Sequence, residues 1–276
     1  MKYSKVKFLT FFAIICSVGL APINDASAND GTILTEVTSI EHDELIPQFT
    51  AQDNSLVQVD SDTYALAYTG VDDDGFISTF TISADGATIT EIATLEHDTN
   101  NSKDNSLVQV DSDTYALAYA GNGMDGFIST FTISSDGATI TEIATLEHDE
   151  FLGKENSLVQ VDSDTFALAY SGGENFSGSG FISTFTISSD GATITEITSV
   201  EHDTNLGRYN SLVQVDSDTY ALAYAGSGYD GFISTFTISS AEEEATTTTS
   251  SDCYDCTPPT LQSSHITILT NDYVVA

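Results

Sequence analysis

The chain has 276 residues, with 42 Asp and Glu against six Lys and Arg, and a formal net charge of −36 at pH 7. So acidic a surface repels phosphate groups, which excludes nucleic acids and anionic membranes as partners and favours cations, basic partners or solubility in salty water. The length suits one large all-β domain.

The first 28 residues have the pattern of a secretory signal peptide. Three lysines within the first seven residues precede an apolar run at 8–21, and the small residues Ala26-Ser27-Ala28 follow. The run is shorter than the roughly 20 residues that a membrane-spanning helix needs. We therefore predict cleavage near Ala28 and a secreted protein, extracellular, periplasmic or at the cell surface, without membrane insertion.

Nearly the same string of about 50 residues then occurs four times. The units begin near Asn54, Asn105, Asn156 and Asn210, at steps of 51, 51 and 54 residues. Each unit contains four runs rich in Thr, Ile, Val, Phe and Tyr, such as SLVQV, TYALAY, GFISTFTIS and TITEIATL, separated by Asp, Ser and Gly. Four short strands in about 50 residues is the size of a propeller blade. Residues 29–240 are therefore predicted to form an all-β propeller of four repeats, each with four antiparallel strands.

Two features concern the packing and the closure of the blades. Small and large residues alternate in Tyr115-Ala116-Leu117-Ala118-Tyr119, so we expect these tyrosines in the core. Residues 32–42 match the last strand of a unit, whereas the fourth unit stops after its third strand at Ser239. We expect this N-terminal strand to complete the last blade and hide its edge. The alternatives are that residues 265–270 supply that strand, or that two chains associate into a larger ring.

The repeats, with phrases such as YALAYxGxxxDGFISTFTIS, resemble tandem-repeat β-propellers of secreted microbial proteins over residues 32–240. The blades have the size of kelch repeats, but the chain has no Trp and a Gly-Gly pair only at Gly172-Gly173. It also lacks the Gly-His and Trp-Asp marks of WD repeats. The resemblance implies a fold and no settled activity.

The units differ mainly in the blade connections and in the loops between the second and third strands, which share one face of a propeller. Variation confined to one face is typical of a binding surface, and also of drift in unconstrained loops. The basic residues Lys103, Lys154 and Arg208 hold the same position in three connections, with Gln52 in the fourth. We expect them either to form a partial ring near the central opening or to neutralise neighbouring Asp and Glu. The candidate ligand-binding residues are Gln52, Lys103, Lys154, Arg208, Tyr209, Asn175, Phe176 and Tyr229.

Metal binding is a second hypothesis. Glu-His-Asp ends the outermost strand of each unit, roughly 15 Å from the first strand, so its copies cannot converge on one site. We expect each His to pack against the next blade, with weak cation sites as the alternative. Acid-rich loops offer oxygen ligands for calcium, the one cofactor that the sequence suggests. The candidate metal ligands are Asp72, Asp73, Asp74, Asp125, Asp230, Glu96, His97 and Asp98.

Residues 241–276 read as a polar linker and tail. It carries Cys253 and Cys256, which in a secreted chain predict a local disulfide, with intermolecular pairing or a metal site as alternatives.

Taken together, these patterns predict a secreted, non-catalytic binding module whose variable face meets an extracellular protein, glycan or cation. One alternative is a calcium-binding structural or adhesion protein of the cell envelope. The other is a propeller-type hydrolase or lyase. An enzyme would need one asymmetric pocket, for which the longer loops at 44–53 and 171–180 are the places to look.

Overall fold

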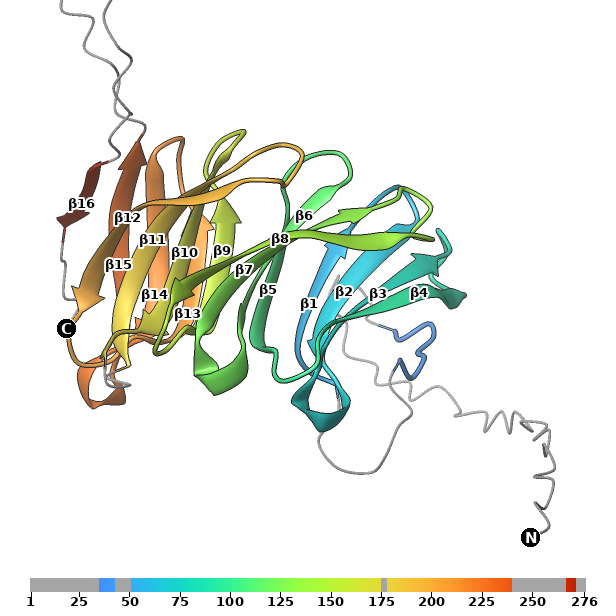
Figure 1. Ribbon diagram of the computed structural model, residues 1–276, viewed down its shortest axis with the longest axis horizontal. Helices are drawn as coiled ribbons and strands as arrows, with labels where there is room; N and C mark the ends of the chain where they lie inside the picture. Colours follow the sequence, from blue (N-terminus) through green and yellow to red (C-terminus); the bar gives the residue numbers. More distant parts are fainter. Residues whose placement is uncertain (1–34, 43–50, 175–177, 240–266, 272–276) are drawn as a thin grey trace, which may run out of the picture. The chain divides into compact units, whose positions relative to one another are not determined.

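The computed structural model describes residues 35–42, 51–174, 178–239 and 267–271 (Figure 1). The described residues from Val37 onward form one compact unit. The predicted signal peptide, the candidate ligand residues Asn175 and Phe176, and the cysteine pair of the tail lie outside the described residues. Within the described ranges, no helix is long and apolar enough to cross a membrane.

The strands form four four-stranded antiparallel sheets. The first contains β1 (Gln52–Gln58), β2 (Thr63–Thr69), β3 (Gly75–Ile82) and β4 (Ile89–Asp98). The second contains β5 (Lys103–Gln109), β6 (Thr114–Ala120), β7 (Gly126–Ile133) and β8 (Ile140–Asp149). The third contains β9 (Lys154–Gln160), β10 (Thr165–Gly172), β11 (Ser179–Ile187) and β12 (Ile194–Asp203). The fourth contains β13 (Arg208–Gln214), β14 (Thr219–Ala225), β15 (Gly231–Ser239) and β16 (Thr267–Asn271). This arrangement confirms the predicted all-β propeller fold of four repeated sheets.

The tight turns within each sheet depend on Asp and Ser side chains that satisfy backbone amides. In the first sheet, Asp60 Oδ1 accepts a hydrogen bond from the Ser61 amide at 2.7 Å. Before β4, Asp85 Oδ1 accepts from the Ser83 hydroxyl at 2.7 Å and from the Ala87 amide at 3.1 Å. Gly86 there has a φ of +69°, which a residue without Cβ adopts at no steric cost.

The core lies between successive sheets, where two different faces meet. One face carries the alanines of the second strand and an Ile of the third, and we call it the alanine face. The opposite face carries the leucines and aromatic rings of the same strands, and we call it the leucine face. The alanine face of the first sheet packs against the leucine face of the second, and the pattern repeats at the next two interfaces. Tyr115 and Tyr119 are 0% and 3% exposed, which confirms their prediction as core residues.

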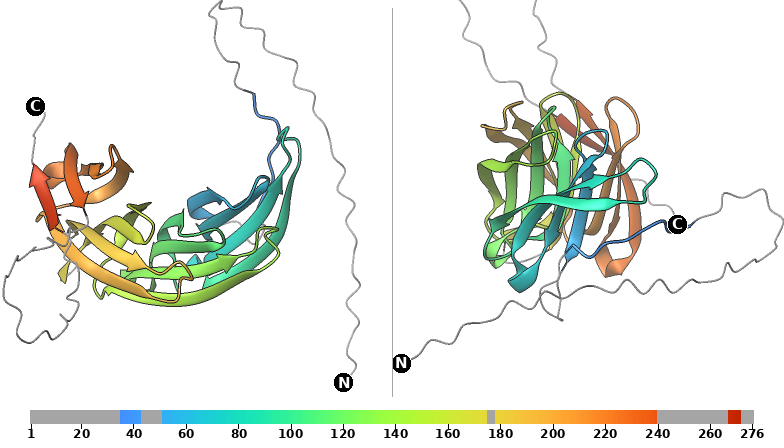
Figure 2. Two further views of the ribbon diagram at one scale, coloured as in Figure 1. Left: turned by 90° about the horizontal axis from the view of Figure 1, so that it is seen from above. Right: turned by 90° about the vertical axis from the view of Figure 1, so that its right-hand side faces the viewer.

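The fourth position in the last sheet is occupied by β16, which pairs with Thr235–Ser239 of β15. The prediction that residues 32–42 complete that sheet is therefore wrong for this structure, and the alternative segment at 265–270 supplies most of the strand. Residues 35–42 form no strand, and Val37–His42 lie beside the first sheet instead (Figure 2). The physical reason is competition, because any β-prone segment of the chain can satisfy an open strand edge.

Candidate functional site

The first strands of consecutive sheets, β1, β5, β9 and β13, lie side by side. Where these strands begin, the same two positions of each repeat line one open cavity of about 170 Å³. We call this set the inner-strand site. It consists of Asp53, Asn54, Asp104, Asn105, Glu155, Asn156, Tyr209 and Asn210.

A β-bulge positions the first residue of each pair. The register between the first and second strands shifts at this point in all four sheets. Asp53, Asp104, Glu155 and Tyr209 all adopt the left-handed conformation, with φ of 51°, 55°, 56° and 56°. A bulge redirects a side chain out of the ladder, and here it brings four equivalent side chains to one cavity.

The asparagine of each pair fixes the preceding connection. Asn156 Nδ2 donates to the Gly153 carbonyl at 3.0 Å, and Asn210 Nδ2 donates to the Gly207 carbonyl at 3.0 Å. Asn210 Nδ2 also lies 3.2 Å from the carbonyl oxygen of Glu155 and so links the third and fourth sheets. The repeated Asn therefore holds the bulge in place and has a structural role.

The carboxyl groups at the centre of the inner-strand site are perturbed. Burial raises the pKa of Asp104, and the nearby Asp53 carboxylate raises it further. Burial and the Asp104 carboxylate likewise raise the pKa of Glu155. The amide of Glu155 donates to the Asp104 carboxylate, and the amide of Tyr209 donates to the Glu155 carboxylate, which partly offsets both shifts. Neighbouring carboxyl groups with raised pKa values can share a proton over the pH range between their two ionisation steps.

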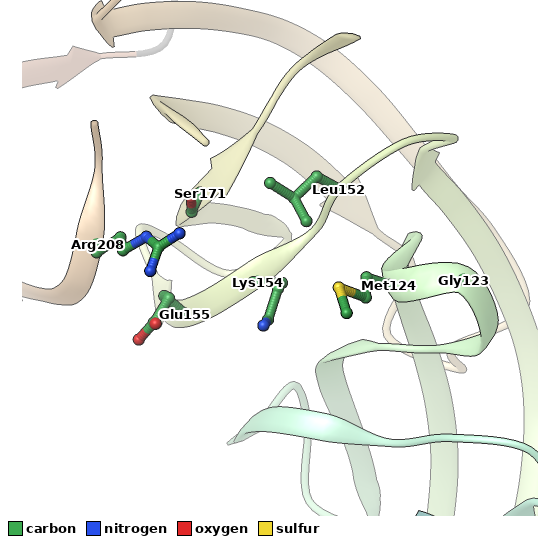
Figure 3. A pocket seen from close by; sticks show the side chains of 7 residues that line it. All are labelled: Gly123, Met124, Leu152, Lys154, Glu155, Ser171 and Arg208. Atoms are coloured by element: carbon green, nitrogen blue, oxygen red, sulfur yellow. The ribbon is translucent and has the colours of Figure 1, made fainter. Parts of the chain in front are cut away.

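A second cavity of about 510 Å³ adjoins this site, because Glu155 lines both. Its other walls are Gly123, Met124, Leu152, Lys154, Ser171 and Arg208. Figure 3 shows the Arg208 guanidinium between Ser171 and Glu155, and the Lys154 ammonium on the same side of the cavity as Glu155. The positive charges of Lys154 and Arg208 lower the pKa of Glu155, against the effect of burial.

The structure brings together three of the predicted ligand residues, namely Lys154, Arg208 and Tyr209, around Glu155. Lys103 instead pairs with Asp73, with Nζ 3.0 Å from Oδ2. Gln52 begins β1 next to Asp53 but does not line either cavity. Tyr229 is 66% exposed in a short 3₁₀ turn that precedes β15.

The acid-rich loops predicted to bind calcium bring carboxyl groups near one another. Burial and the Glu96 carboxylate raise the pKa of Asp74, and Asp74 shares a hydrogen bond with Glu96. Burial and the Asp149 carboxylate raise the pKa of Asp125. In the part of the chain that the structure describes, no group of three or more His, Cys, Asp or Glu is arranged to hold a metal ion. Calcium binding at these loops stays a prediction.

The histidines of the Glu-His-Asp motifs pack against the next sheet, as expected. The His97 ring meets Tyr119 and Phe131 edge-on, with centroids 5.1 and 5.6 Å apart. The His148 ring meets Tyr170 and Phe185 in the same way, at 4.8 and 5.8 Å. Burial lowers the pKa of both histidines to about 4, which keeps them neutral at pH 7. Their role is structural.

In the first three sheets, a glycine at or next to the start of the third strand makes room for the histidine ring. A Cβ at Gly75 would lie 2.6 Å from His97 Nε2, and one at Gly126 would lie 2.6 Å from His148 Cε1. We call this contact the glycine cradle.

Sequence analysis missed Asp53, Asp104 and Glu155, the acidic residues of the inner-strand site. Each lies directly before the repeated Asn and directly after the position that is basic in three repeats. At this position the four repeats have Asp, Asp, Glu and Tyr. That variation was visible in the repeat, but the bulge that turns the position toward a shared cavity was not. The loops proposed for an enzyme pocket do contribute residues, since Asp53 ends one and Ser171 begins the other.

Comparison with known proteins finds similar solved structures but no related sequence family. No family model matches the sequence, and no curated protein sequence matches it either. Saccharomyces cerevisiae Sqt1 is similar with a TM-score of 0.43 and 11% identity, over 68% of this chain and 48% of that one. A 6-phosphogluconolactonase-like protein of Bacteroides fragilis has a TM-score of 0.48 and 15% identity, over 67% and 51%. The GH93 α-L-arabinofuranosidase of Fusarium graminearum has a TM-score of 0.45 and 14% identity, over 68% and 62%. The chain thus spans less than two thirds of the length of each.

These comparisons contradict our prediction of a non-catalytic binding module, and with it the prediction that the protein is not an enzyme. Two of the three solved structures are named as enzymes. At such low identity the likeness shows the fold alone. Any catalytic function of this chain, and the residues that would carry it, therefore have to be argued from the chain's own geometry.

Proposed function

We propose that the protein is a hydrolase that cleaves glycosidic bonds of a neutral polysaccharide at the inner-strand site. One observation carries the proposal, which is that Asp104 and Glu155 line one cavity and each has a raised pKa, caused by burial and by a neighbouring carboxylate. Titratable groups with perturbed pKa values in a cleft are candidates for acid-base catalysis.

Two carboxyl groups are the usual equipment for glycoside hydrolysis. The protonated member gives its proton to the oxygen of the leaving sugar as the glycosidic bond breaks. The ionised member takes a proton from the attacking water, or attacks the sugar carbon itself and is released by water in a second step. Since mutual repulsion keeps Asp104 and Glu155 from ionising together easily, the pair can supply one acid and one base between the two ionisation steps.

The surroundings favour an uncharged substrate. The acidic residues of the site and the net charge of −36 repel anionic polymers. Tyr209 lies at the cavity with 65% of its surface exposed, so its ring is available to stack on a sugar. Lys154 and Arg208 line the adjoining cavity and can donate hydrogen bonds to hydroxyl groups.

The backbone gives independent support. A left-handed conformation costs on the order of 1–3 kcal/mol for a residue other than Gly, and Asn or Asp tolerate it better than other residues. Glu155 and Tyr209 nevertheless occupy it. Side chains that are kept at such a cost are more easily explained by function than by stability.

Replacing Asp104 by Asn or Glu155 by Gln is expected to lower the rate of sugar release about 10²–10⁴-fold, because each change removes a general acid or base. The measurement is the release of reducing ends from a panel of neutral polysaccharides. Glu150→Gln is the matched control, since this exposed glutamate lies in the same connection but outside the cavity.

The melting temperature of the Asp104→Asn variant distinguishes a loss of catalysis from a loss of folding. The raised pKa of Asp104 means that its ionised form destabilises the folded state as the pH rises through that pKa. Asp104→Asn should therefore melt at the same or a higher temperature at pH 7 while it loses activity. Full activity in both Asp104→Asn and Glu155→Gln would overturn the proposal.

The pH dependence of kcat/KM gives a further test. Hydrolysis by a proton-sharing pair is expected to follow a bell-shaped profile, because both groups are protonated at low pH and both are ionised at high pH. Since both pKa values are raised, the acidic limb should lie above the ordinary carboxyl pKa of about 4. A flat profile between pH 4 and pH 8 would contradict this assignment.

A further inference from the structure

The three interfaces between consecutive sheets join the same two faces, but at each end of the series no other sheet of the described residues packs against the remaining face, which we call the uncovered face. On the leucine face, Leu107, Leu158 and Leu212 are 4%, 3% and 6% exposed, whereas the equivalent Leu56 of the first sheet is 57% exposed. On the alanine face of the fourth sheet, Ile233 is 67% exposed, whereas its equivalent Ile77 in the first sheet is fully buried.

The exposed faces extend beyond these two residues. Val213 and Val215 are 57% and 63% exposed on the alanine face of the fourth sheet, where their equivalents Val57 and Val59 pack against the second sheet. The leucine face of the first sheet contains an apolar hollow of about 140 Å³, lined by Ile40, His42, Leu56, Tyr64, Leu66, Phe80, Ile82 and Ile89. Because the repeats are nearly identical, the two uncovered faces are the two halves of an interface that the chain already forms three times.

The glycine cradle shows the same mismatch. A Cβ built on Gly75, Gly126 or Gly180 would lie within 2.8 Å of a histidine ring. A Cβ built on Gly231 would meet no atom within 4 Å. His42 is the histidine left over. Its ring packs edge-on against Tyr68 and Phe80 of the first sheet, at 4.8 and 6.4 Å, in the way that His97 packs against the second sheet.

The outer edge of β15 in the fourth sheet is also only partly paired. In the first sheet, β3 pairs with β4 along its whole length, from Gly75 to Ile82. In the fourth sheet, β16 pairs only with Thr235–Ser239, so no fourth strand among the described residues pairs with 231–234. Judged from the first sheet, Ile233 would pair with the equivalent of Leu95, which is Ile40.

We propose that a second copy of this chain covers these faces, so that the alanine face of each fourth sheet packs against the leucine face of the partner's first sheet. In the pair, residues 40–42 of one chain lie along 231–234 of the other, and His42 of each chain fills the cradle at the other chain's Gly231. Each chain uses each uncovered face once, so two copies close the assembly and leave no face open. The inference is independent of the proposed hydrolytic activity.

The purified protein is expected to have twice the mass of one chain, which is 29.4 kDa for the full 276-residue sequence and less after signal-peptide cleavage, by light scattering during gel filtration at 1–50 μM. About 150 mM salt is required, because the net charge of −36 on each copy opposes association at low ionic strength. Leu56→Glu and Ile233→Glu should each shift the mass to one chain. Phe151→Glu is the control, because this residue is 41% exposed but lies on neither face.

Mixing the two variants tests whether the alanine face of one chain pairs with the leucine face of the other. Leu56→Glu damages only the leucine face and Ile233→Glu only the alanine face, so an equimolar mixture should regain a two-chain species that neither variant forms alone. Gly231→Val should also prevent association, because it fills the cradle, while it leaves the melting temperature of the single chain unchanged. If the wild-type protein has the mass of one chain at every concentration from 1 to 50 μM, the proposal is wrong. This holds whether the two faces remain exposed or pack against each other within one chain. Masses that grow beyond two chains would overturn the closed pair in favour of an open filament.

Discussion

Acidification from pH 6.5 to pH 4 is expected to remove about 3 kcal/mol of folding stability for each of His97 and His148. Burial lowers the folded-state pKa of both histidines from 6.5 to about 4. The unfolded chain therefore takes up these protons first. The stabilisation is complete above pH 6.5 and is lost as the pH falls toward 4.

Urea unfolding at a series of pH values measures this loss. The double variant His97→Leu and His148→Leu keeps apolar volume against the neighbouring rings and removes both titrating groups. Its stability should change far less than that of the wild type between pH 6.5 and pH 4, and the difference between the two curves isolates the histidines from the carboxyl groups. Parallel curves would contradict the lowered pKa values, because they would show that the histidines take up protons equally in the folded and the unfolded chain.

Gly153→Ala is expected to destabilise the fold by about 3 kcal/mol, in the upper range for overpacking a buried position. A Cβ at Gly153 would lie 2.1 Å from Cα of Gly126 and 2.7 Å from its amide nitrogen. Both atoms belong to backbone, so no side chain can rotate away. The collision forces the connection between the second and third sheets away from β7.

The thermal midpoint should fall by roughly 6–12 °C, since 1 kcal/mol corresponds to about 2–4 °C in a domain of this size. Gly231→Ala is the matched control, because a Cβ there meets nothing within 4 Å. Both changes are best compared in the Leu56→Glu background, where the proposed pairing of chains is absent. Equal midpoints for the two variants would show that the backbone at Gly153 adapts freely.

Most of the fold was predictable because its determinants are local and repeated. The alternation around Tyr115 to Tyr119 identifies a strand that is buried on both faces, and the Asp-rich turns set the strand ends. The packing of His97 also followed from alternation, since neighbours in a strand point to opposite sides. The fourth strand of the last sheet was predicted wrongly because two segments share its pattern, and a sequence pattern does not rank their competition for one edge.

The candidate site was only partly predictable. Sequence comparison of the repeats identified Lys154, Arg208 and Tyr209 as variable residues on one face, and the structure brings them together. It missed Asp104 and Glu155, because their importance comes from burial and from contact with each other across different sheets. Those are long-range properties that spacing within a repeat does not contain. For the same reason, a rim of variable loops suggested binding rather than catalysis.

Because the same bulge begins the first strand of each sheet, one repeat can replace another at the cavity. Every unit delivers one side chain to the common cavity through the same backbone turn, while the Asn beside it keeps the turn in shape. The four repeats place Asp, Asp, Glu and Tyr at the cavity, one residue each. Exchanging one whole repeat for another therefore changes one of these four residues without disturbing the packing between sheets. Gene duplication or unequal recombination between the repeats would produce such rewritten sites in one step.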